Sequence, residues 1–293
     1  MTDLSSGLRL SRRGVIVGAA GLASGLAACG RKTATPRGGP LSLQQAVDGD
    51  WRTAADKARD AFRHPAETLD FWGLQPGWTV VEFWPGAGWY TEILAPFLAS
   101  TGGKLYEASL QDDPSDPAAG QMVAAFRRKL ADKPKLYGPV EVTAFGPSSG
   151  PVAPAGSADL VLFLRNLHNW MAAGLAEKAF HDAFAALKPG GVLGLEEHRA
   201  VPGGVPDLLA ADGYVQQAYA LQMGKEAGFV FDKASEINAN PKDGKDHPFG
   251  VWTLPPVRRS SPRGQPDDPT FDHAKYDAIG ESDRMTLRFI KPA

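Results

Sequence analysis

The residues best placed to bind a ligand lie in the stretch 80–91, which reads VVEFWPGAGWYT. Its first four residues are apolar except for one glutamate, as expected for a central strand covered on both faces. Gly86 and Gly88 follow. They lack a Cβ atom, so a turn there can adopt positive φ and a ligand can approach the backbone closely. The next residues predict a helix whose free N–H groups point back toward the turn. In an open α/β sheet, such a turn is a common ligand site.

The spacing of this turn narrows the class of ligand. A dinucleotide fingerprint, G-x-G-x-x-G, requires glycine where Thr91 stands. A phosphate-binding Walker A loop requires a lysine, and none follows the glycines. The pattern that remains is an acid followed by G-x-G at the end of the first strand. A plain strand-to-helix turn of another α/β fold stays open as an alternative.

His168 is the side chain best suited to acid–base chemistry. The apolar run 158–164 predicts a buried strand, and the loop RNLHNW follows it directly. An imidazole titrates near neutral pH, so it can accept a proton from a reacting group. A neighbouring carboxylate would fix its tautomer and stabilise the cation. The alternative is a structural histidine whose nitrogens are satisfied by backbone groups in the loop.

The glycine turn resembles motif I of the class I S-adenosylmethionine (SAM)-dependent methyltransferases. Their pattern, acid-x-Gly-x-Gly-x-Gly, falls on Glu82, Trp84, Gly86 and Gly88, so Trp84 departs from it by replacing the first glycine. The resemblance implies that these four residues bind SAM. Two further residues complete the implied cofactor-binding set, Tyr90 and Asn166.

Glu107 completes the resemblance on the next strand. Residues 104–108 read KLYEA and predict a strand that ends in an acid, about 20 residues beyond the glycine turn. In class I methyltransferases the acid at this strand end accepts hydrogen bonds from the ribose hydroxyls. The resemblance therefore implies that Glu107 binds the ribose of SAM.

The segment after the fourth strand resembles small-molecule O-methyltransferases. In those enzymes Leu-His-Asp-Trp follows the strand, its histidine is the general base, and a later helix ends in Ala-Leu-Lys-Pro-Gly-Gly. This chain has LHNW at residues 167–170, with Asn169 in place of the aspartate, and ALKPGG at 186–191. The resemblance implies His168 as the catalytic base and Glu197, past the fifth strand, as the acid that orients it.

The expected fold is the Rossmann-like class I methyltransferase fold, with seven mostly parallel strands, an antiparallel last strand, and helices on both faces. The resemblance covers about residues 77–228 and the last strand, within one domain at 42–293. Residues 238–283 form a polar insertion between the last strands, rich in proline and glycine, which we expect near the acceptor pocket. As a whole, the chain resembles the bacterial exported "predicted methyltransferase" family.

The N-terminal residues predict export. Residues 1–29 contain Arg12 and Arg13 before a short apolar run, which resembles a twin-arginine signal peptide. The run ends in LAAC, which resembles a lipobox, and Cys29 is the single cysteine of the chain. We expect Cys29 to be acylated, residues 30–41 to be a flexible tether, and the domain to lie at the periplasmic face of a bacterial membrane. An ordinary signal peptide with a coincidental cysteine is the alternative.

Composition and charge restrict the partners. The formal net charge is −2, and no basic cluster with interleaved aromatic residues lies on a predicted helix, which disfavours nucleic acid. The six histidines lack metal-ligand spacing, so no metal is expected.

The predicted function is SAM-dependent methylation of a small molecule, with an oxygen as the acceptor atom. Because SAM is made in the cytoplasm and Trp84 narrows the turn, a non-catalytic SAM-binding or sensing lipoprotein is the alternative. A NAD-dependent enzyme ranks third.

Overall fold

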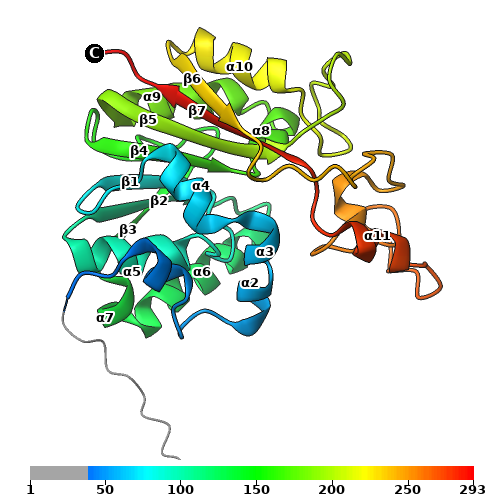
Figure 1. Ribbon diagram of the computed structural model, residues 1–293, viewed down its shortest axis with the longest axis horizontal. Coiled ribbons are helices and arrows are strands. Elements are labelled where there is room, and N and C mark those ends of the chain that lie inside the picture. Colours follow the sequence, from blue (N-terminus) through cyan, green and yellow to red (C-terminus); the bar gives the residue numbers. More distant parts are fainter. Residues whose placement is uncertain (1–38) are drawn as a thin grey trace, which may run out of the picture. The chain divides into compact units, whose positions relative to one another are not determined.

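The fold is built on one seven-stranded sheet (Figure 1). It is seen in a computed structural model, which describes residues 39–293, and these residues form one compact unit. The strand order is β3-β2-β1-β4-β5-β7-β6, and β7 runs antiparallel to both of its neighbours. The expected class I methyltransferase sheet is thus confirmed. The strands are β1 (Thr79–Phe83), β2 (Lys104–Leu110), β3 (Val140–Phe145), β4 (Ala158–Leu164), β5 (Leu187–His198), β6 (Val230–Ser235) and β7 (Arg284–Ile290).

Helices cover both faces of the sheet. On one face α1, α4 and α5 bury residues such as Trp72 and Ile93, and on the other α8, α9 and α10 bury residues such as Trp170 and Phe180. The helices are α1 (Leu43–Val47), α2 (Ala54–Ala58), α3 (Asp60–Arg63), α4 (Pro65–Trp72), α5 (Thr91–Thr101), α6 (Pro117–Asp132), α7 (Pro134–Tyr137), α8 (Leu167–Ala172), α9 (Ala176–Ala186), α10 (Gln217–Glu226) and α11 (Ala274–Ile279), with a 3₁₀ turn η1 (Gly250–Thr253).

An aromatic cluster supports the carboxyl ends of the central strands. The ring of Phe83 meets Phe145, Phe163 and Trp170 edge-on, with centroids 4.9–5.8 Å apart. All four side chains are fully buried. Edge-to-face contacts of this kind add about 0.5–1.5 kcal/mol per pair beyond the burial of area. The turn that follows β1 therefore rests on a rigid base.

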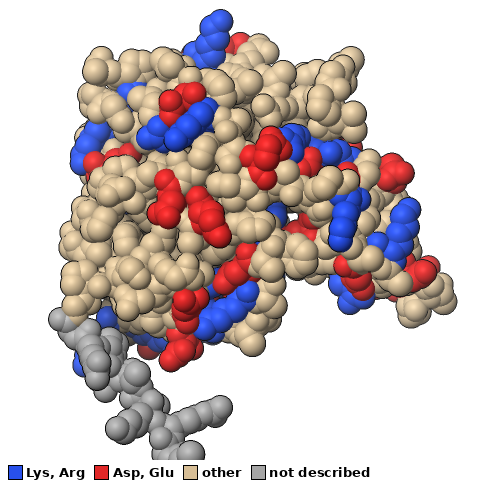
Figure 2. Space-filling model, viewed as in Figure 1, with Lys and Arg blue, Asp and Glu red and all other residues tan. Residues whose placement is uncertain are grey.

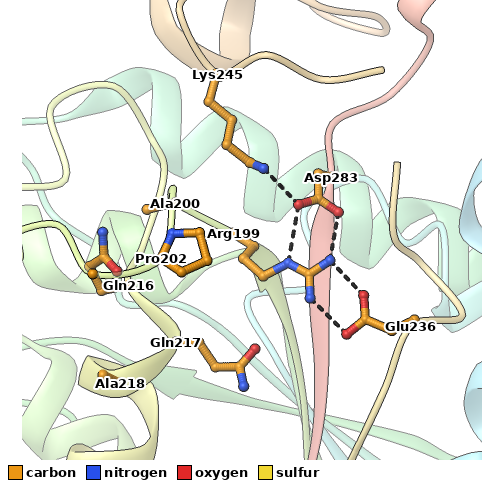
Figure 3. Close-up of a pocket in the computed structure, with 10 residues that line it drawn as sticks. Arg199, Ala200, Pro202, Gln216, Gln217, Ala218, Glu236, Lys245 and Asp283 are labelled. Atoms are coloured by element: carbon orange, nitrogen blue, oxygen red, sulfur yellow. Dashed lines mark hydrogen bonds and ion pairs between the residues drawn. The ribbon is translucent and has the colours of Figure 1, made fainter. Parts of the chain in front are cut away.

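The segment between β6 and β7 lies beyond the end of the sheet at which β7 begins, orange to red in Figure 1. Because β7 is antiparallel to β5, this is also the end at which the parallel strands finish. Arg199, just after β5, holds the segment in place (Figure 3). Its guanidinium donates to both oxygens of Glu236 at 2.7 and 2.8 Å and to those of Asp283 at 2.8 and 3.1 Å, and Lys245 pairs with Asp283 at 2.9 Å.

The predicted export signal at 1–29, with Cys29, and nearly all of the tether lie outside the described residues. Within residues 39–293, no helix has both the length and the apolar character needed to cross a membrane. Basic and acidic side chains are interspersed over the face shown in Figure 2.

Candidate functional site

The glycine turn has the backbone conformation that its sequence predicts. Gly86 and Gly88 adopt φ values of 59° and 84°. A Cβ atom on Gly86 would meet nothing within 4 Å, whereas one on Gly88 would come within 2.9 Å of the Phe126 ring. Gly88 is thus required for packing under α6. Gly86 leaves an exposed stretch of backbone that a ligand could approach.

Trp84 occupies the first position of the turn with φ of 47°, a conformation that is uncommon for a bulky residue. Its indole Nε1 donates to the backbone carbonyl of Phe145 at 3.0 Å, and its ring meets Trp170 edge-on. Trp84 is half-buried and lines a cavity of about 510 Å³, which we call the turn pocket. The wall of this pocket includes Gln111, Asp112, Asp113, Phe145 and Gly146. An aromatic wall beside carboxylates suits a nucleoside, with a flat base and a diol.

Glu107 does not lie where the sequence predicts. Strand β2 continues to Leu110, and Glu107 pairs in register with Glu82 in the middle of the sheet. Its side chain is fully buried, and neither carboxylate oxygen has a hydrogen-bond partner within the described chain. The prediction that Glu107 ends the strand is therefore wrong, and its carboxylate is buried in the sheet rather than placed at the strand end where a ribose was expected. The strand end is set by pairing with β3, where Leu110 lies opposite Phe145.

Glu82 and Glu107 form a buried acidic pair. Glu82 accepts a hydrogen bond from the Thr91 hydroxyl at 3.1 Å, next to the start of α5. Burial raises the pKa of Glu82 to about 7, and burial together with the charge of Glu82 raises the pKa of Glu107 well above its ordinary value. A pair of this kind shares protons at neutral pH. Both carboxyls lie in the sheet just before the turn.

Asp112 and Asp113 are the carboxylates that the turn pocket offers in place of Glu107. Both are exposed and follow the true end of β2. Asp113 accepts hydrogen bonds from the backbone N–H and the hydroxyl of Ser115, which lower its pKa. Sequence reasoning missed both residues because it ended the strand at residue 108.

Tyr90 and Asn166 support the site from beneath. Tyr90 is buried, and its hydroxyl donates to Glu196 on β5 at 3.4 Å. The Asn166 side-chain amide donates to the carbonyls of Phe83 and Trp84 at 3.3 and 3.1 Å, and to that of Leu164 at 3.2 Å. The Asn166 amide hydrogens are thus used to tie the end of β4 to the turn. Neither side chain lines the turn pocket, and the same holds for Glu82, Gly86 and Gly88. That these residues bind the cofactor stays a prediction.

His168 and Glu197 meet as predicted. The Nδ1 atom of His168 lies 2.9 Å from Glu197 Oε1, and the His168 backbone N–H donates to the other oxygen at 3.2 Å. Both side chains are buried. With Nδ1–H donating to the carboxylate, Nε2 is left as the acceptor nitrogen. This is the arrangement of a histidine base oriented by an acid.

A second cavity, of about 260 Å³, is lined by His168, and we call it the histidine pocket. It lies between the carboxyl ends of β4 and β5, helix α3 and the segment between β6 and β7, which we call the 236–283 segment. Its wall also includes Arg59, Arg63, Arg165, His198, Trp252 and Glu281. Burial lowers the pKa of His198 well below its ordinary value, and the neighbouring His168, Arg284 and Arg165 add to this effect.

The arginines around this pocket are paired with two buried carboxylates. Glu281 accepts from Arg59 at 2.9 Å, from Arg63 at 2.8 Å and from Arg284 at 2.9 Å. Glu196 pairs with Arg165 at 3.1 Å and with Arg284 at 3.2 Å. Arg165 follows β4 with φ of 58°, so this strand, like β1, ends in a strained non-glycine residue. Sequence reasoning missed all of these residues.

His168, Glu197 and His198 are also the one group of possible metal ligands within residues 39–293, with ligand atoms inside 4.8 Å of one another. Both oxygens of Glu197 already accept hydrogen bonds, from the backbone N–H groups of His168 and His198 and from the His168 ring. The nearby guanidinium groups would repel a divalent cation. These contacts favour acid–base chemistry over metal binding at this group.

The comparisons with known proteins concern the fold. No protein-family model and no curated protein matches the chain. A SAM dependent methyltransferase from Aquifex aeolicus matches with a TM-score of 0.53 and 16% identity, over 86% of this chain and 99% of the other. The [4+2]-cyclase SpnF matches with a TM-score of 0.54 and 16% identity, over 84% and 85%.

Phosphoethanolamine N-methyltransferase 2 from Haemonchus contortus, solved in complex with S-adenosyl-L-methionine, matches with a TM-score of 0.50 and 13% identity. The match covers 86% of this chain but only 60% of that protein. Because the sequence identities are only 13–16%, the similarity to these structures shows the fold alone. One of these structures is named a cyclase, so the fold by itself does not determine the reaction. The chain has the class I methyltransferase fold.

Proposed function

We propose that this protein is a SAM-dependent methyltransferase that methylates a small molecule, with an oxygen as the acceptor atom. The observation that carries the proposal is the buried His168–Glu197 pair, whose Nδ1–Oε1 distance is 2.9 Å. It stands at the carboxyl ends of adjacent strands of a methyltransferase fold and lines a pocket. In open α/β sheets this edge is where ligands bind.

The turn pocket is the proposed site for SAM, which would supply an electrophilic methyl group. Trp84 would stack on the adenine, and Asp112 with Asp113 would accept hydrogen bonds from the ribose hydroxyls. Gly86, which does not line the pocket itself, would allow close approach to the backbone of the same turn beside it. The volume of about 510 Å³ lies within the range of about 300–1,000 Å³ that is usual for small-molecule sites.

The proposed role of His168 is to remove the acceptor proton. Its Nε2 would accept the proton from a hydroxyl in the histidine pocket, and Glu197 would stabilise the resulting imidazolium through Nδ1–H. Asn166 would keep the two strand ends in register, because it ties β4 to the turn after β1. The side chains of the site thus divide into donor binding, acceptor activation and positioning.

A non-catalytic SAM-binding protein is the second candidate. The observation that favours it is Trp84 at a glycine position, because its indole would narrow the crevice where the methionine part of SAM would lie and so hinder transfer rather than binding. We also propose that the protein is exported and lipid-anchored through Cys29, in keeping with Arg12 and Arg13 before the apolar run.

Labelled SAM, incubated with the full-length protein and a panel of phenols, quinols and hydroxy acids, tests the proposal. We expect labelled product from the wild type and a rate about 10²–10⁴-fold lower in His168→Ala, the usual contribution of a positioned base. His181→Ala, which removes an exposed histidine on α9, is the matched control and should be unaffected. Tight SAM binding without transfer to any acceptor would favour the binding protein instead.

A further inference from the structure

We propose that the histidine pocket recognises a compact organic anion, so that the methyl acceptor carries a carboxylate or phosphate group besides the atom that is methylated. That this anion is the methyl acceptor rests on the proposed function. The anion site itself is argued from the side chains alone. Arg59, Arg63 and Arg165 all line the pocket, and Glu281 is the one acidic residue in its wall.

The guanidinium groups of Arg59 and Arg63 have unused donors. Within residues 39–293, both arginines bind Glu281 through Nε alone, which leaves four terminal N–H bonds on each without a protein acceptor. Arg63 is 4% exposed, so its guanidinium lies in a largely buried position whose terminal nitrogens border the pocket. Arg63 also lies over the Trp89 ring at 4.8 Å, which fixes the plane of its guanidinium. A planar, pre-oriented fork of donors matches a carboxylate or a phosphate.

The charges around the pocket leave a positive excess. Four guanidinium groups face three carboxylates even when Glu197 is counted with Glu196 and Glu281. The four arginines are Arg59, Arg63, Arg165 and Arg284. Uncompensated charge in a buried site is unfavourable, and an anionic ligand would relieve it.

The opposite wall limits the size and shape of the ligand. Trp252, Leu254 and Pro255 come from the 236–283 segment, and the Trp252 ring lies 5.9 Å from that of His168. The volume of about 260 Å³ is below the range of about 300–1,000 Å³ usual for drug-sized ligands. A small ligand with a flat apolar body, one anionic end toward the arginines and a hydroxyl toward His168 fits these constraints.

Calorimetry without SAM tests the anion site separately from catalysis. The probes for the full-length protein are 4-hydroxybenzoate, phenyl phosphate and inorganic phosphate, with 4-hydroxybenzamide as the uncharged counterpart. We expect at least one anion to bind about tenfold or more tightly than the amide, since hydrogen bonds between charged groups are the strong ones. The carboxylate and phosphate probes identify which head group the site prefers, and either preference supports the proposal.

Two substitutions localise the effect. Arg63→Lys keeps the charge but removes the fork. Arg59→Gln changes a side chain that is 26% exposed, so we expect the variant to fold. Each should weaken anion binding about tenfold, whereas Arg128→Gln, on the exposed face of α6, should not. Absence of binding by all three anions, or equal affinity for the amide, would overturn the inference. Anion binding without methylation of any acceptor would overturn only the proposed function.

Discussion

Replacing Glu107 by glutamine should make the protein more stable above neutral pH. The change removes one charge from the buried pair, keeps the side-chain shape, and supplies an amide that can donate to Glu82. The two glutamates lie opposite each other in register, and neither oxygen of Glu107 has a partner within the described chain. The wild-type protein must therefore bury an unpaired charge whenever Glu107 ionises.

The direction of the pH effect follows from the raised pKa values. Below about pH 4.5 the carboxyls of Glu82 and Glu107 are protonated in both folded and unfolded chains, so they add no pH dependence. Above that, the unfolded chain releases protons that the folded chain keeps, so the free energy of unfolding falls as pH rises. For Glu82 the rise from 4.5 to about 7 corresponds to a loss on the order of 3 kcal/mol, at about 1.4 kcal/mol per pKa unit. Glu107 extends the loss to higher pH.

Equilibrium urea unfolding between about pH 5 and pH 8 measures this effect. The wild type should lose several kcal/mol over that range, and Glu107→Gln about half as much or less, with higher stability at the alkaline end. Glu67→Gln, at an exposed position of α4, is the control and should follow the wild type. If the Glu107→Gln and wild-type curves run parallel, the carboxyl is not held protonated and the reasoning is wrong.

Three further predictions address the turn and the anchor. Trp84→Ala should weaken SAM binding by about 1–3 kcal/mol if the indole stacks on the base, whereas tighter binding in calorimetry would show that Trp84 obstructs the site. Gly88→Ala should lower the free energy of unfolding by about 1–3 kcal/mol, because φ is 84° and Phe126 blocks the Cβ, and Gly86→Ala should lower it less in the same urea titration. Cys29→Ser should move the protein from the membrane fraction to the soluble fraction in cell fractionation, and unchanged attachment would contradict lipid anchoring.

Local sequence patterns were sufficient for the turn and for the His168–Glu197 pair. Gly86 and Gly88 report a backbone requirement directly in residue type. His168 follows the strongly apolar strand β4, whereas Glu197, expected just past the fifth strand, is the second-last residue of β5. Parallel neighbours finish at the same edge, so the two residues still meet because of the topology.

The position of Glu107 and the arginine cluster could not be read in this way. Ser109 and Leu110 suit a strand or a loop equally, and the end of β2 is decided by pairing with β3, which is remote in sequence. The contacts of Arg59 and Arg63 with Glu281 cross more than 200 residues, with separations of 222 and 218. Such contacts leave no periodic signal in the sequence.

Calorimetric titration of SAM into the full-length protein tests the central claim most directly. The account predicts binding to the wild type, a loss of about tenfold or more in Asp112→Asn/Asp113→Asn, since each charge-assisted hydrogen bond contributes about 1.5–3 kcal/mol, and unchanged affinity at neutral pH in Glu107→Gln. Failure of the wild type to bind SAM, with binding of NADH instead, would contradict the assignment of the turn pocket. If only Glu107→Gln lost SAM binding, Glu107 rather than Asp112 and Asp113 would be the residue that binds the ribose.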